Sequence, residues 1–350
     1  MQGKMKQAIM TEIGKLKMIE VDIPQIAPDE VLVKVEHVGI CGSDLHYFET
    51  GAIGDFIVEC PFVLGHESGG TVVEVGENVK HLQKGDRVAM EPGKTCGHCE
   101  FCREGKYNLC PDVIFFATPP VDGTFQEYVA HEADLCFKLP ENVDTMEGAL
   151  IEPLAVGFHA AMQGNAQVGQ SAVVFGAGCI GIVSLLALKA MGVGDVYVVD
   201  VLPKRLEKAM ELGATGVING AEQNTVEALK EIFGSRGCDL VIETSGTEIA
   251  AQQSIAALKK GGTVVMVGYS KTGMVTLPMS MAMDKEVTIK TIFRYRHIYP
   301  MAIKAVAEGK VNLKGIVSSM FDFDNVQEAM DESIRNKAEI TKGVIKMFKD

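Results

Sequence analysis

Four cysteines lie within one short segment of the chain, with two, two and seven residues between them. Thiolates bind Zn²⁺ well, and four of them complete a tetrahedral shell that leaves no open position for a substrate. In a reducing compartment such a cluster is more typical of a metal site than of disulfide bonds. The pattern therefore predicts a structural zinc site, although His98 inside the segment could replace one ligand. The cysteines are Cys96, Cys99, Cys102 and Cys110.

A second group of potential metal ligands is spread along the sequence. One thiolate, one imidazole and one carboxylate can hold Zn²⁺ with a fourth position free for water or substrate, which is the composition of a catalytic zinc site. Taken singly, such residues more often pack in a core or cap an element. Their joint appearance beside glycines, which allow tight turns around an ion, favours metal binding. The candidates are Cys41, His66, Glu67 and Glu152.

A glycine pattern, GxGxxG, follows the apolar strand pattern of residues 171–175 and opens a helical pattern that ends near residue 191. Its first glycine permits a tight turn, its second lets a pyrophosphate approach the backbone, and its third allows close packing of helix on strand. The start of the helix then offers unpaired N–H groups to the anion. The loop predicts a dinucleotide site with the glycines Gly176, Gly178 and Gly181.

Asp200 ends the next strand pattern, 19 residues after Gly181. A carboxylate at this place binds the ribose hydroxyls and would repel a 2′-phosphate, so NAD is favoured over NADP. Arg205 nearby is a partial counter-argument, because a guanidinium can bind a phosphate. A packing turn without a ligand is the less favoured alternative.

Two kinds of hydrophobic pattern divide the chain into two regions of different predicted structure. Residues 6–92 carry short strands separated by Gly, Asp and Asn, which is typical of an antiparallel or barrel-like domain. From about residue 169, strands and helices alternate, which predicts a doubly wound parallel sheet of the α/β class. The predicted strands are 171–175, 195–199, 216–219, 239–243 and 263–267, and helices are predicted up to 191 and over 205–212, 225–233 and 250–258. A closing strand is predicted at 344–348.

The composition fits a globular protein of two or three domains, with 350 residues of which 47% are hydrophobic. The formal charge of −13, from 33 basic and 46 acidic residues, disfavours nucleic acid as a partner. No run approaches the ~20 apolar residues of a membrane span, and the first ten residues lack the apolar core of a signal peptide. The predicted location is the cytoplasm, with no membrane partner.

Five runs of sequence carry a family resemblance: Cys41-Gly-Ser-Asp-Leu-His-Tyr47, Gly65-His-Glu67, Phe115-Phe-Ala-Thr-Pro-Pro-Val-Asp-Gly123, Ala149-Leu-Ile-Glu-Pro-Leu-Ala-Val-Gly157 and Phe293-Arg-Tyr295. Together with the other motifs they resemble the zinc-dependent medium-chain dehydrogenase/reductase superfamily, and within it the sorbitol (L-iditol 2-) dehydrogenases and related polyol dehydrogenases. Zinc alcohol dehydrogenases are less similar, because their third catalytic ligand is a cysteine. The resemblance implies a GroES-like β-barrel catalytic domain, 1–156 and 297–350, interrupted by a Rossmann NAD-binding domain, 157–296.

The resemblance also implies a role for individual residues. Cys41, His66 and Glu67 would bind the catalytic zinc, and Glu152 would join them directly or through a water molecule. The implied cofactors are NAD and two zinc ions per chain, one catalytic and one structural. The implied polyol contacts are Tyr47, Glu152, Arg294 and Tyr295. The implied NAD contacts are Gly176, Gly178, Ile180, Gly181, Asp200, Arg205, Val267, Gly268, Tyr269, Ile292, Phe293 and Arg294.

The implied reaction is oxidation of a secondary hydroxyl of a polyol to the ketose. Zn²⁺ would lower the pKa of the hydroxyl, and hydride would pass from the neighbouring carbon to NAD. Ser43 and His46, beside Cys41, could relay the proton to water, or could simply form hydrogen bonds within their loop. Relatives of this kind form homotetramers, and the same assembly is expected here.

Other functions remain open at this point. The same chemistry could act on xylitol, galactitol, butanediol or L-threonine, and the sequence selects neither one substrate nor a reaction direction. A non-catalytic nucleotide-binding protein would be expected to have lost Cys41, His66 or Asp200, all of which are present. A zinc-free quinone reductase is disfavoured because both ligand sets are intact.

Overall fold

The computed structural model describes residues 2–349, which form two units, each built around its own sheet. The first unit comprises the residues up to Glu152, then Tyr299–Ala307, and the residues from Val317 onwards. The second comprises Pro153–Ile298 and Glu308–Ile316. The chain therefore leaves the first unit and returns to it near its end.

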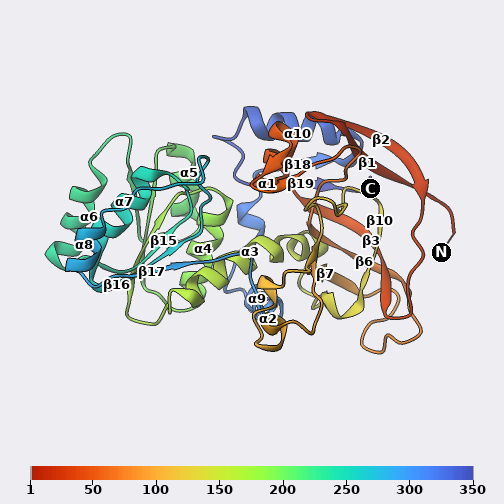
Figure 1. The fold of residues 1–350 in the computed structure, drawn as a ribbon, viewed down its shortest axis with the longest axis horizontal. Coiled ribbons are helices and arrows are strands. Elements are labelled where there is room, and N and C mark those ends of the chain that lie inside the picture. Colours follow the sequence, from red (N-terminus) through yellow and green to blue (C-terminus); the bar gives the residue numbers. More distant parts are fainter. Residues whose placement is uncertain (1, 350) are drawn as a thin grey trace. The chain divides into compact units, whose positions relative to one another are not determined.

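The first unit is built on a seven-stranded sheet whose pairings are antiparallel, except that β18 and β19 run parallel. The alternating run that begins at Glu30 forms its central strand, and Val31, Val33 and Val35 lie in the core, as the pattern predicts. The order is β11 (Cys136–Lys138), β7 (Arg87–Met90), β6 (Glu67–Val75), β3 (Glu30–Gly39), β19 (Gly343–Lys346) and β18 (Ser319–Asp322), with β10 (Tyr128–Glu132) also paired to β3. Figure 1 shows β3 and β6 side by side.

Shorter elements complete this unit. Its strand pairs are β1 (Lys4–Glu12) with β2 (Lys15–Asp22), β4 (Ala52–Ile53) with β5 (Phe56–Ile57), and β8 (Gly93–Lys94) with β9 (Ile114–Phe115). Its helices are α1 (Gly42–Thr50), α2 (Glu100–Arg103), α9 (Tyr299–Ala307) and α10 (Val326–Arg335), with 3₁₀ turns η1 (Tyr107–Leu109), η2 (Ala133–Leu135) and η5 (Phe323–Asn325). The helix α3 (Thr145–Gln163) begins in the first unit and continues into the second, with Pro153 inside it.

The second unit contains a six-stranded sheet in which every pairing is parallel. Its order is β14 (Gly216–Asn219), β13 (Asp195–Asp200), β12 (Ser171–Phe175), β15 (Cys238–Glu243), β16 (Leu258–Met266) and β17 (Thr288–Thr291). The chain adds strands outwards from β12 to β14 and then continues on the other side of β12 with β15, so the strand order reverses between β12 and β15. Doubly wound sheets bind ligands at such a point, at the carboxyl ends of their strands. The predicted parallel sheet is confirmed, and β17 is an additional strand.

Helices pack around this sheet (Figure 1). They are α4 (Cys179–Ala190), α5 (Pro203–Glu211), α6 (Thr225–Phe233), α7 (Glu248–Ala257) and α8 (Met279–Asp284), with 3₁₀ turns η3 (Gly234–Arg236) and η4 (Lys314–Ile316). The strands carry continuous apolar runs because both faces are covered, and Val173, Val241 and Val264 are completely buried. No helix among residues 2–349 has the length and apolar character needed to cross a membrane.

Candidate active site

The register of two neighbouring strands brings the dispersed metal ligands together. Gly39 of β3 pairs with Glu67 of β6, so Cys41, which follows β3, lies beside His66, which precedes β6. The Cys41 sulfur, a His66 ring nitrogen and a Glu67 carboxylate oxygen all lie within 4.8 Å of one another. Ligand atoms around a tetrahedral Zn²⁺ are roughly 3.3 to 3.8 Å apart, so small side-chain movements bring this donor set onto one ion. The residues therefore fit a zinc ion.

Asp44 supports this group, although it is not among the site residues predicted from the sequence. Its carboxylate is completely buried and accepts hydrogen bonds from the Gly65 N–H at 2.9 Å and the Cys41 N–H at 3.3 Å. One oxygen also lies 3.4 Å from Nδ1 of His66. Burial lowers the pKa of His66, but Asp44 and Cys41 outweigh it and hold this pKa well above its ordinary value. Asp44 thus orients the imidazole and both ligand-bearing turns.

Lys342 is a second supporting residue that was not predicted from the sequence. Its ammonium group lies 2.7 Å and 2.5 Å from the two carboxylate oxygens of Glu67, and it donates to the Ile40 carbonyl at 3.0 Å. Both side chains of the ion pair are 1% exposed. The Lys342 ammonium group therefore holds both the Glu67 carboxylate and the main chain of Ile40, which directly precedes Cys41.

The small size of Gly39 is required by this arrangement. A Cβ atom at Gly39 would lie 2.0 Å from Oε2 of Glu67, which is far inside van der Waals contact. The Glu67 carboxylate occupies the space that a side chain at Gly39 would need. This explains the glycine that precedes the Cys41 turn.

The four clustered cysteines form a separate group whose sulfur atoms also lie within 4.8 Å of one another. Main-chain N–H groups point at the sulfurs: Cys99 donates to Cys96 at 3.3 Å, and Cys102 donates to Cys99 at 3.4 Å. The N–H groups of His98 and Cys99 lower the pKa of Cys96 to about 6. Such bonds stabilise thiolates, which are the form that binds a metal. We call residues 96–110 the cysteine lobe.

A buried carboxyl group anchors the cysteine lobe to the sheet of the first unit. Glu91, directly after β7, is 4% exposed and accepts a 2.8 Å hydrogen bond from the hydroxyl of Tyr107 in the lobe. Its main-chain oxygen lies 2.8 Å from Nε2 of His131. Burial raises the pKa of Glu91 to about 7, although the Tyr107 hydrogen bond opposes this.

The raised pKa of Glu91 predicts a pH-dependent effect of Glu91→Gln. Between pH 4.5 and about 7 the folded protein binds a proton that the unfolded chain has lost, so this carboxyl reduces stability as the pH rises. The uncharged glutamine should therefore raise the free energy of unfolding at pH 8 by up to about 3 kcal/mol, with little effect at pH 5. Urea unfolding of both proteins at the two pH values measures this difference. An equal gain at both values would contradict the assignment.

The glycine loop has the geometry that its pattern predicts. Gly176 follows β12 with φ of 93°, a conformation that favours glycine. A Cβ atom at Gly181 would lie 1.8 Å from the Gly176 carbonyl oxygen, so the third glycine is needed for the helix to pack on the turn. Gly178 is the N-cap of α4. The loop therefore presents the start of a twelve-residue helix to an anion.

Asp200 ends β13 beside this loop. Its carboxylate accepts hydrogen bonds from the N–H groups of Ala177 at 2.6 Å, Val201 at 2.7 Å and Leu202 at 3.0 Å. These bonds fix the orientation of the carboxylate, and its oxygens have capacity for further hydroxyl donors. Arg205 also lies near the glycine loop. One of its guanidinium nitrogens would be 3.6 Å from a Cβ atom placed at Gly178.

The other predicted nucleotide contacts follow β16 and β17 at the same edge of the parallel sheet. Val267 and Gly268 donate hydrogen bonds to the Glu243 carbonyl at 2.8 and 3.0 Å. Arg294 has φ of 53° and lies over the Phe293 ring at 4.8 Å. Positive φ in a residue other than glycine costs energy and is concentrated at functional sites. Ile180 lies in the first turn of α4, and Tyr269 is 72% exposed.

The remaining predicted residues are distributed over both units. Ser43 is half-buried and His46 exposed on α1. Tyr47 on the same helix is buried, and its ring packs on Phe62 with centroids 6.5 Å apart. Glu152 on α3 is 6% exposed and is outside the group of Cys41, His66 and Glu67. Tyr295, in the second unit, is 3% exposed.

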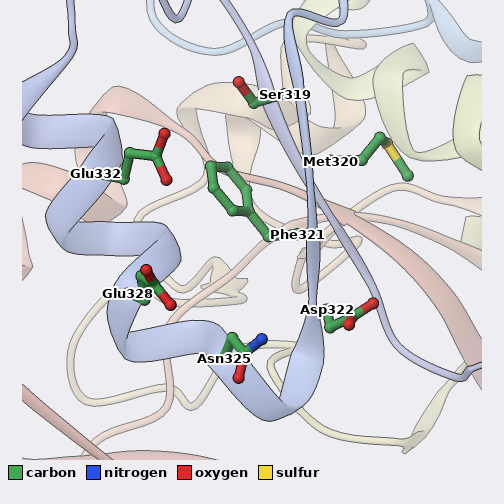
Figure 2. Close-up of a pocket in the computed structure, with 7 residues that line it drawn as sticks. All are labelled: Ser319, Met320, Phe321, Asp322, Asn325, Glu328 and Glu332. Carbon is green, nitrogen blue, oxygen red and sulfur yellow. The ribbon is translucent and has the colours of Figure 1, made fainter.

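A surface hollow of about 440 Å³ lies between β18 and α10 and contains none of the predicted site residues (Figure 2). Its lining is Ser319, Met320, Phe321, Asp322, Asn325, Glu328 and Glu332. The acidic side chains there would repel an anionic nucleotide, so this hollow does not compete with the glycine loop as a cofactor site.

Two metal-ligand groups and a parallel sheet with a glycine loop define a zinc-binding dehydrogenase that uses a nicotinamide dinucleotide. Comparison with family models agrees, since residues 27–141 match the alcohol dehydrogenase GroES-like domain and residues 179–308 match the zinc-binding dehydrogenase domain. The chain belongs to the zinc-dependent medium-chain dehydrogenase family, in its sorbitol and polyol dehydrogenase branch. The predicted family and fold class are thereby confirmed, as are zinc and a nicotinamide dinucleotide as cofactors.

Three relatives illustrate this similarity. The chain is 43% identical to sorbitol dehydrogenase of Bacillus subtilis, over 97% of both chains. A crystal structure of an Escherichia coli oxidoreductase of unknown specificity superimposes with a TM-score of 0.95 at 45% identity, covering 99% of this chain and 100% of the other. That of 2R,3R-butanediol dehydrogenase from Bacillus subtilis gives a TM-score of 0.90 at 32% identity, covering 98% and 100%.

Proposed function

We propose that the protein oxidises a secondary hydroxyl of a polyol similar to sorbitol, L-iditol or xylitol, forming the ketose and transferring hydride to NAD. The observation that carries this proposal is the Cys41, His66 and Glu67 group, because a carboxylate completes it where zinc alcohol dehydrogenases have a cysteine. The similarity to a named sorbitol dehydrogenase supports the same substrate class.

We assign the catalytic zinc to Cys41, His66 and Glu67, and the structural zinc to the cysteine lobe. When bound, the catalytic zinc supplies a Lewis acid that lowers the pKa of the substrate hydroxyl. Asp44 keeps the His66 ring in place, and Lys342 holds the Glu67 carboxylate. Ser43 and His46 carry the hydroxyl proton towards water. Tyr47, Glu152, Arg294 and Tyr295 orient the polyol by hydrogen bonding.

The assignment of NAD over NADP is also part of the proposal. The Asp200 carboxylate is held beside the glycine loop by three N–H groups, so it cannot turn away from a bound ribose without losing them. Its charge binds the 2′- and 3′-hydroxyls of NAD and repels the 2′-phosphate of NADP. We further propose the domains 1–156 with 297–350 and 157–296, a homotetramer, and a cytoplasmic location, as in the family that the chain resembles.

A substrate panel tests the proposal directly. NADH formation at alkaline pH should be fastest with sorbitol, L-iditol or xylitol, and replacement of NAD by NADP should reduce kcat/KM by at least about tenfold, the effect of roughly 1.4 kcal/mol. Ribitol, galactitol, L-threonine and 2,3-butanediol complete the panel. Faster turnover of butanediol or threonine would show that the substrate is another secondary alcohol and not a polyol of the proposed class. NADH binding without any turnover would instead support a non-catalytic nucleotide-binding protein.

A further inference from the structure

Glu243 is a buried carboxyl group at the carboxyl end of β15 that has no place in the proposed reaction. Its side chain is completely buried. Oε1 accepts three hydrogen bonds from the turn that follows, from the Ser245 N–H at 2.7 Å, the Ser245 hydroxyl at 2.6 Å and the Gly246 N–H at 3.0 Å. Burial raises the pKa of Glu243, and these hydrogen bonds oppose the increase. A group with this desolvation cost needs a structural or functional reason.

The main chain of Glu243 contacts a second turn. Its carbonyl oxygen accepts hydrogen bonds from the N–H groups of Val267 at 2.8 Å and Gly268 at 3.0 Å. These residues follow β16 and are among the proposed NAD contacts. The same residue therefore joins the turn after β15 to the turn after β16.

The two turns pack without free space. A Cβ atom at Gly246 would lie 2.2 Å from the Tyr269 carbonyl oxygen, and one at Gly268 would lie 2.2 Å from the Gly246 nitrogen. Gly246 also has φ of 66°, which favours glycine. Because each backbone fills the space beside the other, a shift of the first turn must move the second.

Thr244 connects the same turn to the glycine loop. Its N–H and its hydroxyl both lie 2.8 Å from the Phe175 carbonyl, and the hydroxyl lies 3.3 Å from the Gly176 carbonyl. A Cβ atom at Gly176 would be 2.7 Å from this hydroxyl. The Thr244 side chain thus contacts Gly176, the first glycine of the loop proposed to bind the phosphates.

We propose that Glu243 is a positioning residue for the dinucleotide. Its carboxyl group sets the turn of residues 244–246, which supports the glycine loop on one side and the 267–269 turn on the other. Three donors of this turn, the Ser245 N–H, the Ser245 hydroxyl and the Gly246 N–H, all bind to one acceptor oxygen of Glu243. This inference rests on the proposed function, because it assumes that the nucleotide is NAD.

Two variants of Glu243 separate positioning from charge. All three close hydrogen bonds end on Oε1, so the amide oxygen of Glu243→Gln can accept them, and the dissociation constant for NADH should stay within about twofold. Glu243→Leu fills a similar volume without an acceptor and should weaken NADH binding tenfold or more, which corresponds to about 1.4 kcal/mol. NADH fluorescence titration measures both. The KM for NAD should rise in parallel, while the zinc content and the KM for the polyol remain close to those of the wild type.

Matched controls distinguish this effect from general destabilisation. Ser254→Ala removes a completely buried hydroxyl of α7 that donates to the Ala250 carbonyl of the same helix, and it should leave NADH affinity unchanged. If Glu243→Leu does not fold, Thr244→Val keeps the side-chain shape, removes the hydroxyl and should still weaken NADH binding several-fold. Wild-type NADH affinity in the Leu or Val variant, or equal losses in Gln and Leu, would overturn the inference. A wild-type protein that does not bind NADH would instead overturn the proposed function.

Discussion

Replacement of Cys41 by serine should abolish polyol oxidation while NADH binding remains measurable. The hydroxyl of serine is a poor ligand for Zn²⁺, and His66 and Glu67 alone do not hold the ion in a tetrahedral shell. The loss of several kcal/mol of charge stabilisation should lower kcat/KM by at least about 10³-fold. Metal analysis should show zinc falling from about two ions per chain to about one, because the cysteine lobe is unaffected.

Cys60→Ser is the matched control for this variant. Cys60 is exposed and belongs to neither group of metal ligands. Its replacement should leave turnover and zinc content at wild-type values. Full turnover in Cys41→Ser, or loss of both zinc ions, would show that the ligand assignment is wrong.

Lys342→Met should weaken the catalytic zinc site although Lys342 is not a ligand. Methionine keeps an unbranched stem but leaves the buried Glu67 carboxylate without its cation, which costs about 3–5 kcal/mol of unfolding free energy. The ligand is also no longer held in place, so zinc affinity should fall about 10- to 100-fold. Chelator competition measures the affinity, and thermal unfolding measures the stability.

The double variant Lys342→Met with Glu67→Gln separates the two effects. Removing the carboxylate charge should recover much of the lost stability, because no buried charge then lacks a partner, but it should not recover zinc binding. Lys230→Met is the control, since its ion pair with Glu227 lies on the surface and contributes little. Unchanged zinc affinity in Lys342→Met would contradict a positioning role.

The sequence predicted the parts of the site that are local in the chain. The glycine loop and Asp200 form within one strand, turn, helix and strand unit, and the cysteine lobe closes within fifteen residues, so their spacing alone indicated their geometry. Alternation of strands and helices likewise predicted the parallel sheet. The alternation could not predict the strand order, because β15 is distant in sequence from β12 and yet pairs with it on the side opposite β13.

The supporting residues were missed because distant pairings create them. Lys342 reaches Glu67 across 275 positions of sequence, through the pairing of β19 with β3 and of β3 with β6. No local pattern marks a lysine that will become buried. Asp44 had a usable signal, since an acidic residue three positions after an N-cap often bonds back to the cap, as it does at Cys41. The strand β17 has only four residues, and none of the three residues before it is Gly, Pro, Asn or Asp, so its sequence pattern was too weak to detect.

The Lys342 ion pair also sets an order of events during synthesis on the ribosome. The residues of the second unit from Pro153 to Ile298 are complete before Lys342 is made, so its sheet can form while the chain is still being translated. Glu67 is made early, yet its cation arrives 275 residues later. Until then the strands β3 and β6 would enclose an uncompensated carboxylate, which opposes their closure. The group of Cys41, His66 and Glu67 is therefore expected to form after the parallel sheet of the second unit.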